Sequence, residues 1–105
     1  MFAKKNRISA LEVQKMFSSD VKTAHSEFFL LKKRSNDLGL SRFAVLIPKK
    51  VSKTAVQRHF DKRMVVSAIQ KVNYPVSYDY VLTLKKSIKE SSLDAITADL
   101  VRILI

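Results

Sequence analysis

Several residue types are scarce or missing in this chain of 105 residues, and each absence excludes a class of protein or site. There is no cysteine, which rules out disulfides and thiolate metal sites. A single glycine, Gly39, cannot build a glycine-rich phosphate loop. No apolar run approaches the roughly 18 to 20 residues that cross a bilayer. We therefore expect no membrane partner and a cytoplasmic location.

Acidic residues are also few, and the resulting charge imbalance is the main functional signal. The chain has 20 Lys and Arg but only 9 Asp and Glu, which gives a formal net charge of +11. Residues 1–71 carry 16 basic and 5 acidic side chains, whereas residues 72–105 carry four of each. Solubility alone does not require such segregation, so a polyanion such as nucleic acid is the natural partner.

Hydrophobic periodicity and helix stops predict one domain over residues 1–105, an α/β (α+β) two-layer sandwich. The expected order is helix, strand, strand, helix, strand, helix, with a turn at Asn36, Asp37 and Gly39. The predicted helices are a short one from Ser9 with Glu12 as its capping-box partner, a long one from Lys53 to about residue 73 capped by Ser52, and a last one capped by Ser91 or Ser92. The last helix is expected to face inward with Leu93, Ile96, Leu100, Ile103 and Leu104. The predicted strands are 27–33, a central strand at 43–47 covered on both faces, and 76–84 with one buried face.

The basic side chains concentrate in residues 49–63, KKVSKTAVQRHFDKR, where six Lys or Arg accompany one Asp. Arg58 and Lys62 are four residues apart and share a helix face, and His59 and Arg63 form a second such pair. Free N–H groups at the helix start also favour phosphate. A solvated face would explain one pair, but so many like charges repel each other unless an anion offsets them. We therefore predict a nucleic-acid-binding surface.

A protein-based active site is not indicated. His25 and His59 fall on different predicted elements and match no zinc-binding spacing. Asp94 and Asp99 are expected to be solvated on the last helix. We thus expect neither catalytic nor metal-binding residues. The residues alone leave open a general RNA-binding or ribosome-associated protein, a small autonomous nuclease and a DNA-binding module.

The 49–63 segment resembles the signature of the bacterial ribonuclease P protein subunit, in which a strand ending in Lys-Lys-Val leads into a basic helix. Residues 6–8 resemble the family's opening, residues 12–17 its first helix and residues 78–82 its last strand. The positions that keep the family's residue types are Lys49, Lys50, Lys53, Ala55, Arg58, Lys62 and Arg63.

Four positions of the long helix depart from the family pattern. His59 stands where the family usually has Asn, and Phe60 where it usually has a second Arg. Gln57 and Asp61 fall where apolar residues are common. We therefore expect the buried stripe of the helix to move to Val56, Phe60 and Met64.

The resemblance implies a protein that binds the catalytic RNA of ribonuclease P and helps it remove the 5′ leader from precursor tRNA. The chemistry would belong to that RNA and its Mg²⁺ ions. A left-handed βαβ crossover through the long helix is also implied, against the general right-handed rule. The RNA-binding residues expected from the resemblance are Lys49, Lys50, Lys53, Arg58, His59, Lys62, Arg63 and Arg7.

The family also has a cleft between the first helix and the sheet, which holds the single-stranded leader. Aromatic rings in such a cleft can stack on unpaired bases without reading their sequence. The residues expected to line it here are Phe17, Val13, Phe29 and Leu31, each of which could instead belong to the core.

Overall fold

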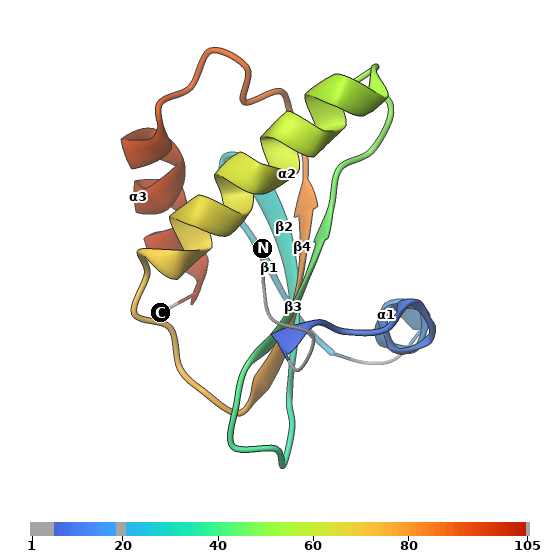
Figure 1. Cartoon of the computed structure of the whole chain (residues 1–105). Coiled ribbons are helices and arrows are strands. Elements are labelled where there is room, and N and C mark those ends of the chain that lie inside the picture. The colour runs from blue at the N-terminus through green and yellow to red at the C-terminus, as the bar shows by residue number, and fades with distance from the viewer. Residues whose placement is uncertain (1–5, 19–20, 105) are drawn as a thin grey trace.

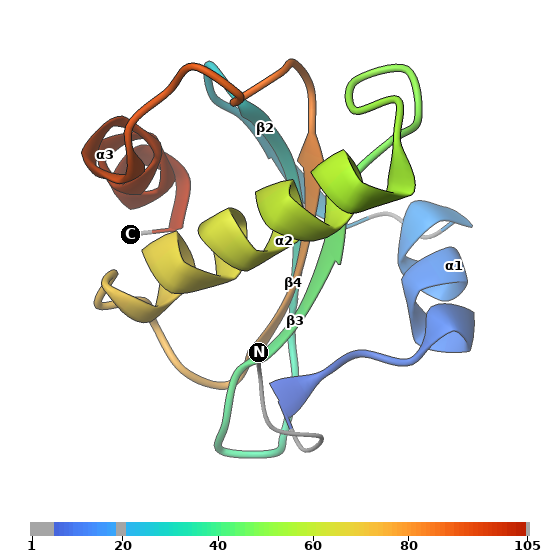
Figure 2. The same ribbon diagram turned by 45° about the horizontal axis from the view of Figure 1, so that its top comes forward.

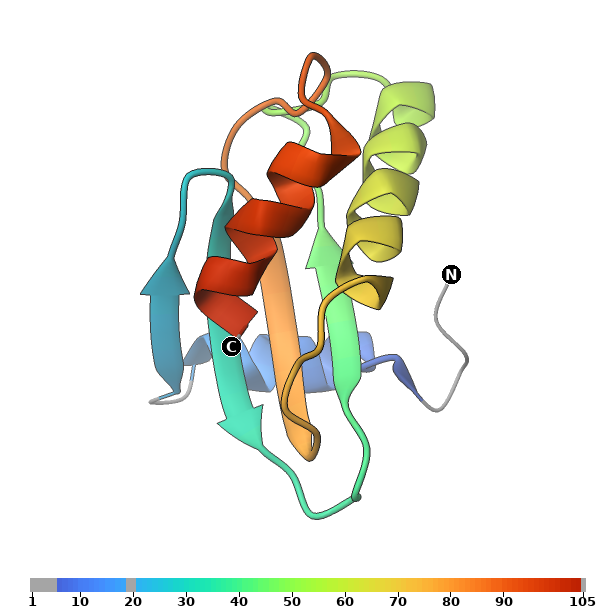
Figure 3. The same cartoon turned by 90° about the vertical axis from the view of Figure 1, so that its left-hand side faces the viewer.

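The computed structural model describes residues 6–18 and 21–104, which form a four-stranded sheet and three helices and so confirm the mixed α/β class. The helices α2 and α3 cover one face of the sheet, and α1 crosses the other face (Figures 1 and 3). No helix in this part of the chain is long and apolar enough to cross a membrane. The elements are α1 (Ala10–Ser18), β1 (Lys22–His25), β2 (Phe29–Ser35), β3 (Arg42–Leu46), α2 (Ala55–Gln70), β4 (Tyr78–Leu84) and α3 (Leu93–Leu104).

The strand order of the sheet is β1-β2-β4-β3, with β3 and β4 parallel and the other pairs antiparallel. The prediction that the 43–47 strand is central is wrong, because β3 pairs with β4 on one side and meets an isolated bridge from Arg7 to Phe43. The central strand with two buried faces is β4, in which Tyr80, Val81 and Leu82 are all fully buried. The prediction that this strand has only one buried face is wrong, because Val81 on its other face is buried and packs under α1.

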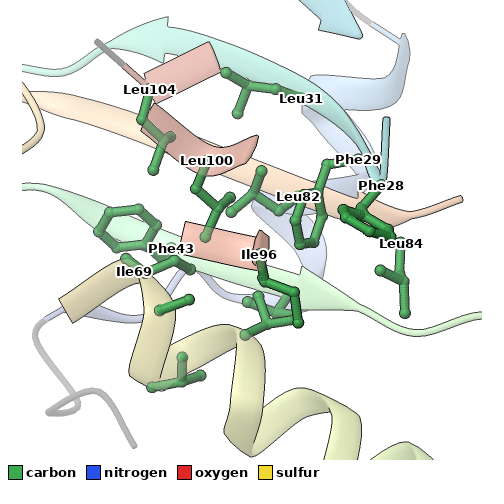
Figure 4. Close-up of a cluster of buried hydrophobic side chains, with 14 of the residues drawn as sticks. Phe28, Phe29, Leu31, Phe43, Ile69, Leu82, Leu84, Ile96, Leu100 and Leu104 are labelled. Carbon is green, nitrogen blue, oxygen red and sulfur yellow. The ribbon is translucent and has the colours of Figure 1, made fainter. Parts of the chain in front are cut away.

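Two hydrophobic clusters hold the layers together. The larger lies between the sheet and the helices α2 and α3, and includes Phe29, Leu31, Phe43 and Leu82 (Figure 4). The predicted inward stripe of α3 is confirmed, and Ser92 caps that helix by accepting a hydrogen bond from the Ala95 N–H at 3.1 Å. The smaller cluster packs α1 on the opposite face through Ile8, Val13, Met16 and Val81.

Strand β1 and the residue that fixes its turn were both missed by the sequence analysis. The segment KTAH is short and polar, so it carries no strand periodicity. The turn after it is fixed by Asp99 of α3, which is only 3% exposed. Its carboxylate accepts hydrogen bonds from Ser26 Oγ at 2.7 Å and from the N–H groups of Glu27 and Phe28 at 3.2 and 3.0 Å. The prediction of a solvated Asp99 is therefore wrong, whereas Asp94 is exposed as expected.

The turn between β2 and β3 lies where the sequence predicts it. Gly39 has φ +70°, a left-handed conformation that favours glycine. Asn36 stabilises the turn, since its side-chain oxygen accepts a hydrogen bond from the Leu38 N–H at 3.0 Å.

Helix α2 begins two residues later than predicted. Thr54, not Ser52, is its N-cap, and the Thr54 hydroxyl accepts a hydrogen bond from the Gln57 N–H at 3.0 Å. The predicted shift of the buried stripe is wrong for Val56 and Phe60, which are 82% and 58% exposed. Only Met64 of that stripe is partly buried and packs against the larger cluster. Asp61 is buried instead, and its carboxylate accepts a hydrogen bond from Gln57 Nε2 at 2.8 Å.

Candidate nucleic-acid interface

An open groove of about 480 Å³ reaches from α1 across the edge strand β3 to the N-terminal half of α2. Figure 2 shows α1 and α2 on either side of β3. Strand pairing places Leu30, Thr83 and Leu46 in one row on the α1 side of the sheet, where they form the floor. Phe17 lines one end of the groove and is 44% exposed. The α2 residues that line the other end are Arg58, His59 and Lys62.

A cation of the sheet lies beside the Phe17 ring. Lys32 Nζ of β2 lies 5.4 Å from the centroid of that ring, within the range of a cation–π contact. The groove thus combines an exposed aromatic ring, an apolar floor and positive charge at both ends.

Phe29 and Leu31 do not line the groove, so that part of the predicted cleft is corrected. Their side chains are 0% and 2% exposed and pack in the larger core cluster on the opposite face of the sheet. Alternate residues of a strand point to opposite faces, and a shift of one residue exchanges them. Residues 28–31 of this strand are all apolar, so no alternation with polar residues indicates that Leu30 faces the groove.

Val13 and Arg7 lie beside the groove rather than in it. They line an adjoining hollow of about 270 Å³, together with Lys62 and the strand β3. Val13 is 9% exposed and belongs mainly to the small core cluster, whereas Arg7 is exposed. Lys62 borders both the groove and this hollow, so it is the cation shared by the two.

Arg58 organises the loop before α2. Its Nη1 group donates hydrogen bonds to the carbonyl oxygens of Ser52 and Lys53, at 3.1 and 3.3 Å. The exposed side chains of Lys49, Lys50 and Lys53 extend from this loop. Arg58 therefore supplies charge to the groove and also holds the three lysines next to it.

Arg63 faces away from the groove. It lines a separate hollow with Phe60, on the side of α2 that faces the start of α3. The predicted pair of His59 and Arg63 is therefore divided, because His59 lines the groove and Arg63 does not.

An ion network that the sequence analysis missed fixes α1 over the sheet. Strand pairing aligns Arg34, Asp79 and Arg42, and the Asp79 carboxylate accepts hydrogen bonds from Arg34 Nε at 3.0 Å and from Arg42 Nε at 2.8 Å. Glu12 of α1 accepts from Arg34 Nη2 at 3.1 Å and from Arg42 Nη2 at 2.6 Å. Burial alone would raise the pKa of the Asp79 carboxyl, but hydrogen bonds from Arg42, Asn36 and Arg34 hold it below its usual value of 3.8.

A comparison with family models identifies the chain. The model for ribonuclease P matches residues 2–105, nearly the whole sequence. The chain belongs to the ribonuclease P protein family. It is thus the protein subunit of an endoribonuclease complex that acts in tRNA 5′ processing, and it associates with ribonuclease P RNA. A search of curated proteins finds no match.

Solved structures of ribonuclease P proteins share the fold. The protein from Thermotoga maritima is 22% identical, with a TM-score of 0.81 over 93% of this chain and 94% of that chain. The protein from Staphylococcus aureus is 18% identical, with a TM-score of 0.78 over 94% of this chain and 92% of that one. A Staphylococcus aureus mutant described as defective in mRNA degradation gives a TM-score of 0.80 at 19% identity, over 96% and 86% of the two chains.

Proposed function

We propose that the groove between α1 and α2 holds the single-stranded 5′ leader of precursor tRNA, while the basic residues of α2 and its preceding loop face ribonuclease P RNA. The observation that carries this proposal is the exposed Phe17 ring above an apolar floor, with Lys32 on one side and Arg58, His59 and Lys62 on the other. An exposed ring can stack on an unpaired base, and the surrounding cations can neutralise the phosphates of the same strand. Such contacts suit a leader of variable sequence.

The same proposal assigns the chemistry to the RNA and its Mg²⁺ ions, in the cytoplasm, and no catalytic group to the protein. The buried carboxylates of Asp61, Asp79 and Asp99 each accept hydrogen bonds from protein donors. Residues 6–18 and 21–104 contain no cluster of three or more His, Asp or Glu that could hold a metal ion. In this proposal the Mg²⁺ ions are held by phosphates of the RNA, which are oxygen ligands that suit this cation.

Cleavage of precursor tRNA by the ribonuclease P RNA of the same genome tests this proposal, at low millimolar Mg²⁺ with and without the protein. We expect strong stimulation by the protein and no cleavage by the protein alone. Tight RNA binding without stimulation would instead indicate a general RNA-binding role. Cleavage by the protein alone would overturn the assignment of the chemistry to the RNA.

Phe17→Ala tests the groove itself. Loss of one stacking contact should weaken binding of precursor tRNA to the reconstituted holoenzyme about tenfold, with little effect on mature tRNA, which has no leader. Val101→Ala on α3 is the control, since Val101 is 42% exposed and lies outside the groove. Equal losses for precursor and mature tRNA would show that Phe17 supports the fold rather than the leader.

A further inference from the structure

Phe60 is one of two exposed aromatic rings among the described residues, and the other is Phe17 of the groove. Phe60 is 58% exposed, whereas Phe28, Phe29 and Phe43 are at most 7% exposed. Exposing a phenylalanine ring to water forgoes the favourable free energy of its burial. Such an exposed ring on a rigid helix is a candidate contact surface.

The surroundings of Phe60 form a hollow distinct from the groove. The hollow has a volume of about 310 Å³, and its lining comprises Phe60, Arg63, Met64, Ser67 and the first residue of α3, Leu93. The two helices lie side by side on the same face of the sheet (Figure 3). The hollow thus combines the apolar side chains of Phe60, Met64 and Leu93 with the charged side chain of Arg63.

The position of the hollow on α2 separates it from the leader groove. Successive residues of an α-helix are rotated by about 100°, because one turn contains 3.6 residues. Arg58 and Lys62 therefore project on one side of α2, and Phe60 and Arg63 project on nearly the opposite side. An aromatic ring thus lies close to cations on each side of α2: Phe17 of α1 lines the groove, and Phe60 of α2 itself lines the hollow.

The positive charge around the hollow indicates which kind of partner can bind there. The only acidic residue of α2, Asp61, is buried and engaged by Gln57, so the exposed charges of the helix are all positive. A second copy of this chain, with its own net charge of +11, would be repelled. A purely apolar peptide would leave Arg63 without an anionic partner. A nucleotide offers both a ring for Phe60 and a phosphate for Arg63.

We propose that Phe60 stacks on an unpaired base of ribonuclease P RNA and that Arg63 pairs with a neighbouring phosphate of the same strand. This inference rests on the proposed function, in which α2 faces that RNA. It adds a second contact surface on α2, separate from the surface that binds the leader. The two residues make different contributions, since stacking adds affinity that depends little on salt and a phosphate contact adds affinity that salt weakens.

Binding of the full-length protein to ribonuclease P RNA, measured over a series of salt concentrations, tests this assignment. Phe60→Ala and Phe60→Leu should each weaken binding about tenfold without changing the salt slope. Phe60→Trp should retain wild-type affinity. Arg63→Gln should lower the salt slope by about one unit. Val56→Ala, on the same side of the helix and 82% exposed, is the control and should bind like the wild type.

Tryptophan fluorescence offers a direct test of stacking, because the chain has no tryptophan of its own. In Phe60→Trp the single indole should be quenched when ribonuclease P RNA binds, because stacking on a base quenches its fluorescence. Unchanged emission, or wild-type affinity for both Phe60→Ala and Phe60→Leu, would overturn the proposal. So would self-association of the wild type that Phe60→Ala abolishes in sedimentation, which would assign the hollow to a second copy.

The same measurements separate this inference from the proposed function. If the Phe60 variants bind normally while Lys62→Gln weakens binding, the stacking contact is refuted and the basic surface of α2 stands. If neither change affects binding, α2 does not face the RNA and both proposals fail.

Discussion

Lys62 is the one charged side chain, among the described residues, that borders both the groove and the hollow containing Arg7. We predict that Lys62→Gln weakens binding of ribonuclease P RNA and lowers the slope of log affinity against log salt by about one unit, because one phosphate contact is lost. Lys71→Gln removes the same charge at the far end of α2 and serves as the control. Equal effects of the two substitutions would show that only net charge matters.

The sequence predicted those site residues whose positions depend on local helix geometry. Arg58, His59 and Lys62 lie together because residues three and four apart share a helix face. Phe29 and Leu31 were misplaced, because which face of a strand is buried depends on the helices that cover it. The partners of Asp99 lie 71 to 73 residues away in the sequence, so no local pattern could identify them.

At the level of the element, the start of α2 positions the basic loop. Thr54→Ala should lower the free energy of unfolding by about 1 kcal/mol, because an N-cap hydrogen bond is lost. Ser52→Ala should have little effect, since the buried Ser52 hydroxyl has no hydrogen-bond partner among the described residues. Urea unfolding of the two variants measures the difference. A larger loss for Ser52→Ala would contradict the assignment of Thr54 as the cap.

The row of Arg34, Asp79 and Arg42 makes the attachment of α1 sensitive to acid. Because the folded-state pKa of Asp79 is below 3.8, its contribution to stability is present above that pH and is lost as the pH falls through the lower folded value. We predict that Asp79→Asn costs roughly 3 kcal/mol at neutral pH, since Arg42 and Arg34 lose a charged partner.

Unfolding by urea at several pH values checks this prediction, with the exposed Asp94→Asn as the control. The difference between wild type and Asp79→Asn should shrink as the pH falls below 3.8. A difference that stays constant with pH would mean that ionisation of Asp79 does not contribute to the free energy of unfolding.

Element type was predictable from the sequence, whereas the position of each strand in the sheet was not. The apolar run of β3 suggested a central strand, but it lies at an edge that is partly covered through Arg7 and by α1. The crossover through α2 places β4 between β2 and β3. Strand β1 owes its place to pairing with β2 and to the turn that Asp99 fixes, not to its own composition.

Over the whole molecule, the fold redistributes charge in a way that a count along the sequence misses. Residues 72–105 have four acidic side chains, but Asp79 and Asp99 are buried and engaged within the protein. The surface of that segment is therefore more basic than its net charge of zero suggests. Repulsion among the exposed cations destabilises the free protein.

A bound polyanion should relieve this repulsion and stabilise the fold. We predict that ribonuclease P RNA at about 100 times its dissociation constant raises the melting temperature by roughly 10 °C, as expected for a ligand that binds only the folded state. At that same RNA concentration the shift should disappear in high salt, because salt raises the dissociation constant. The protein alone at each salt concentration is the reference. A shift that persists in high salt would show that apolar contacts dominate binding.

The tyrosines of this protein are gathered in one place. Tyr80 lies 5.0 Å from Phe43 between ring centroids, and Tyr74 and Tyr78 lie 6.1 and 6.0 Å from Tyr80. None of the three lines the groove or the two hollows beside α2. The native tyrosine emission of this tryptophan-free chain therefore reports the integrity of the core, while the groove and the two hollows contribute no tyrosine emission. An indole introduced by Phe60→Trp adds a signal for binding, so that folding and binding can be followed separately in one sample.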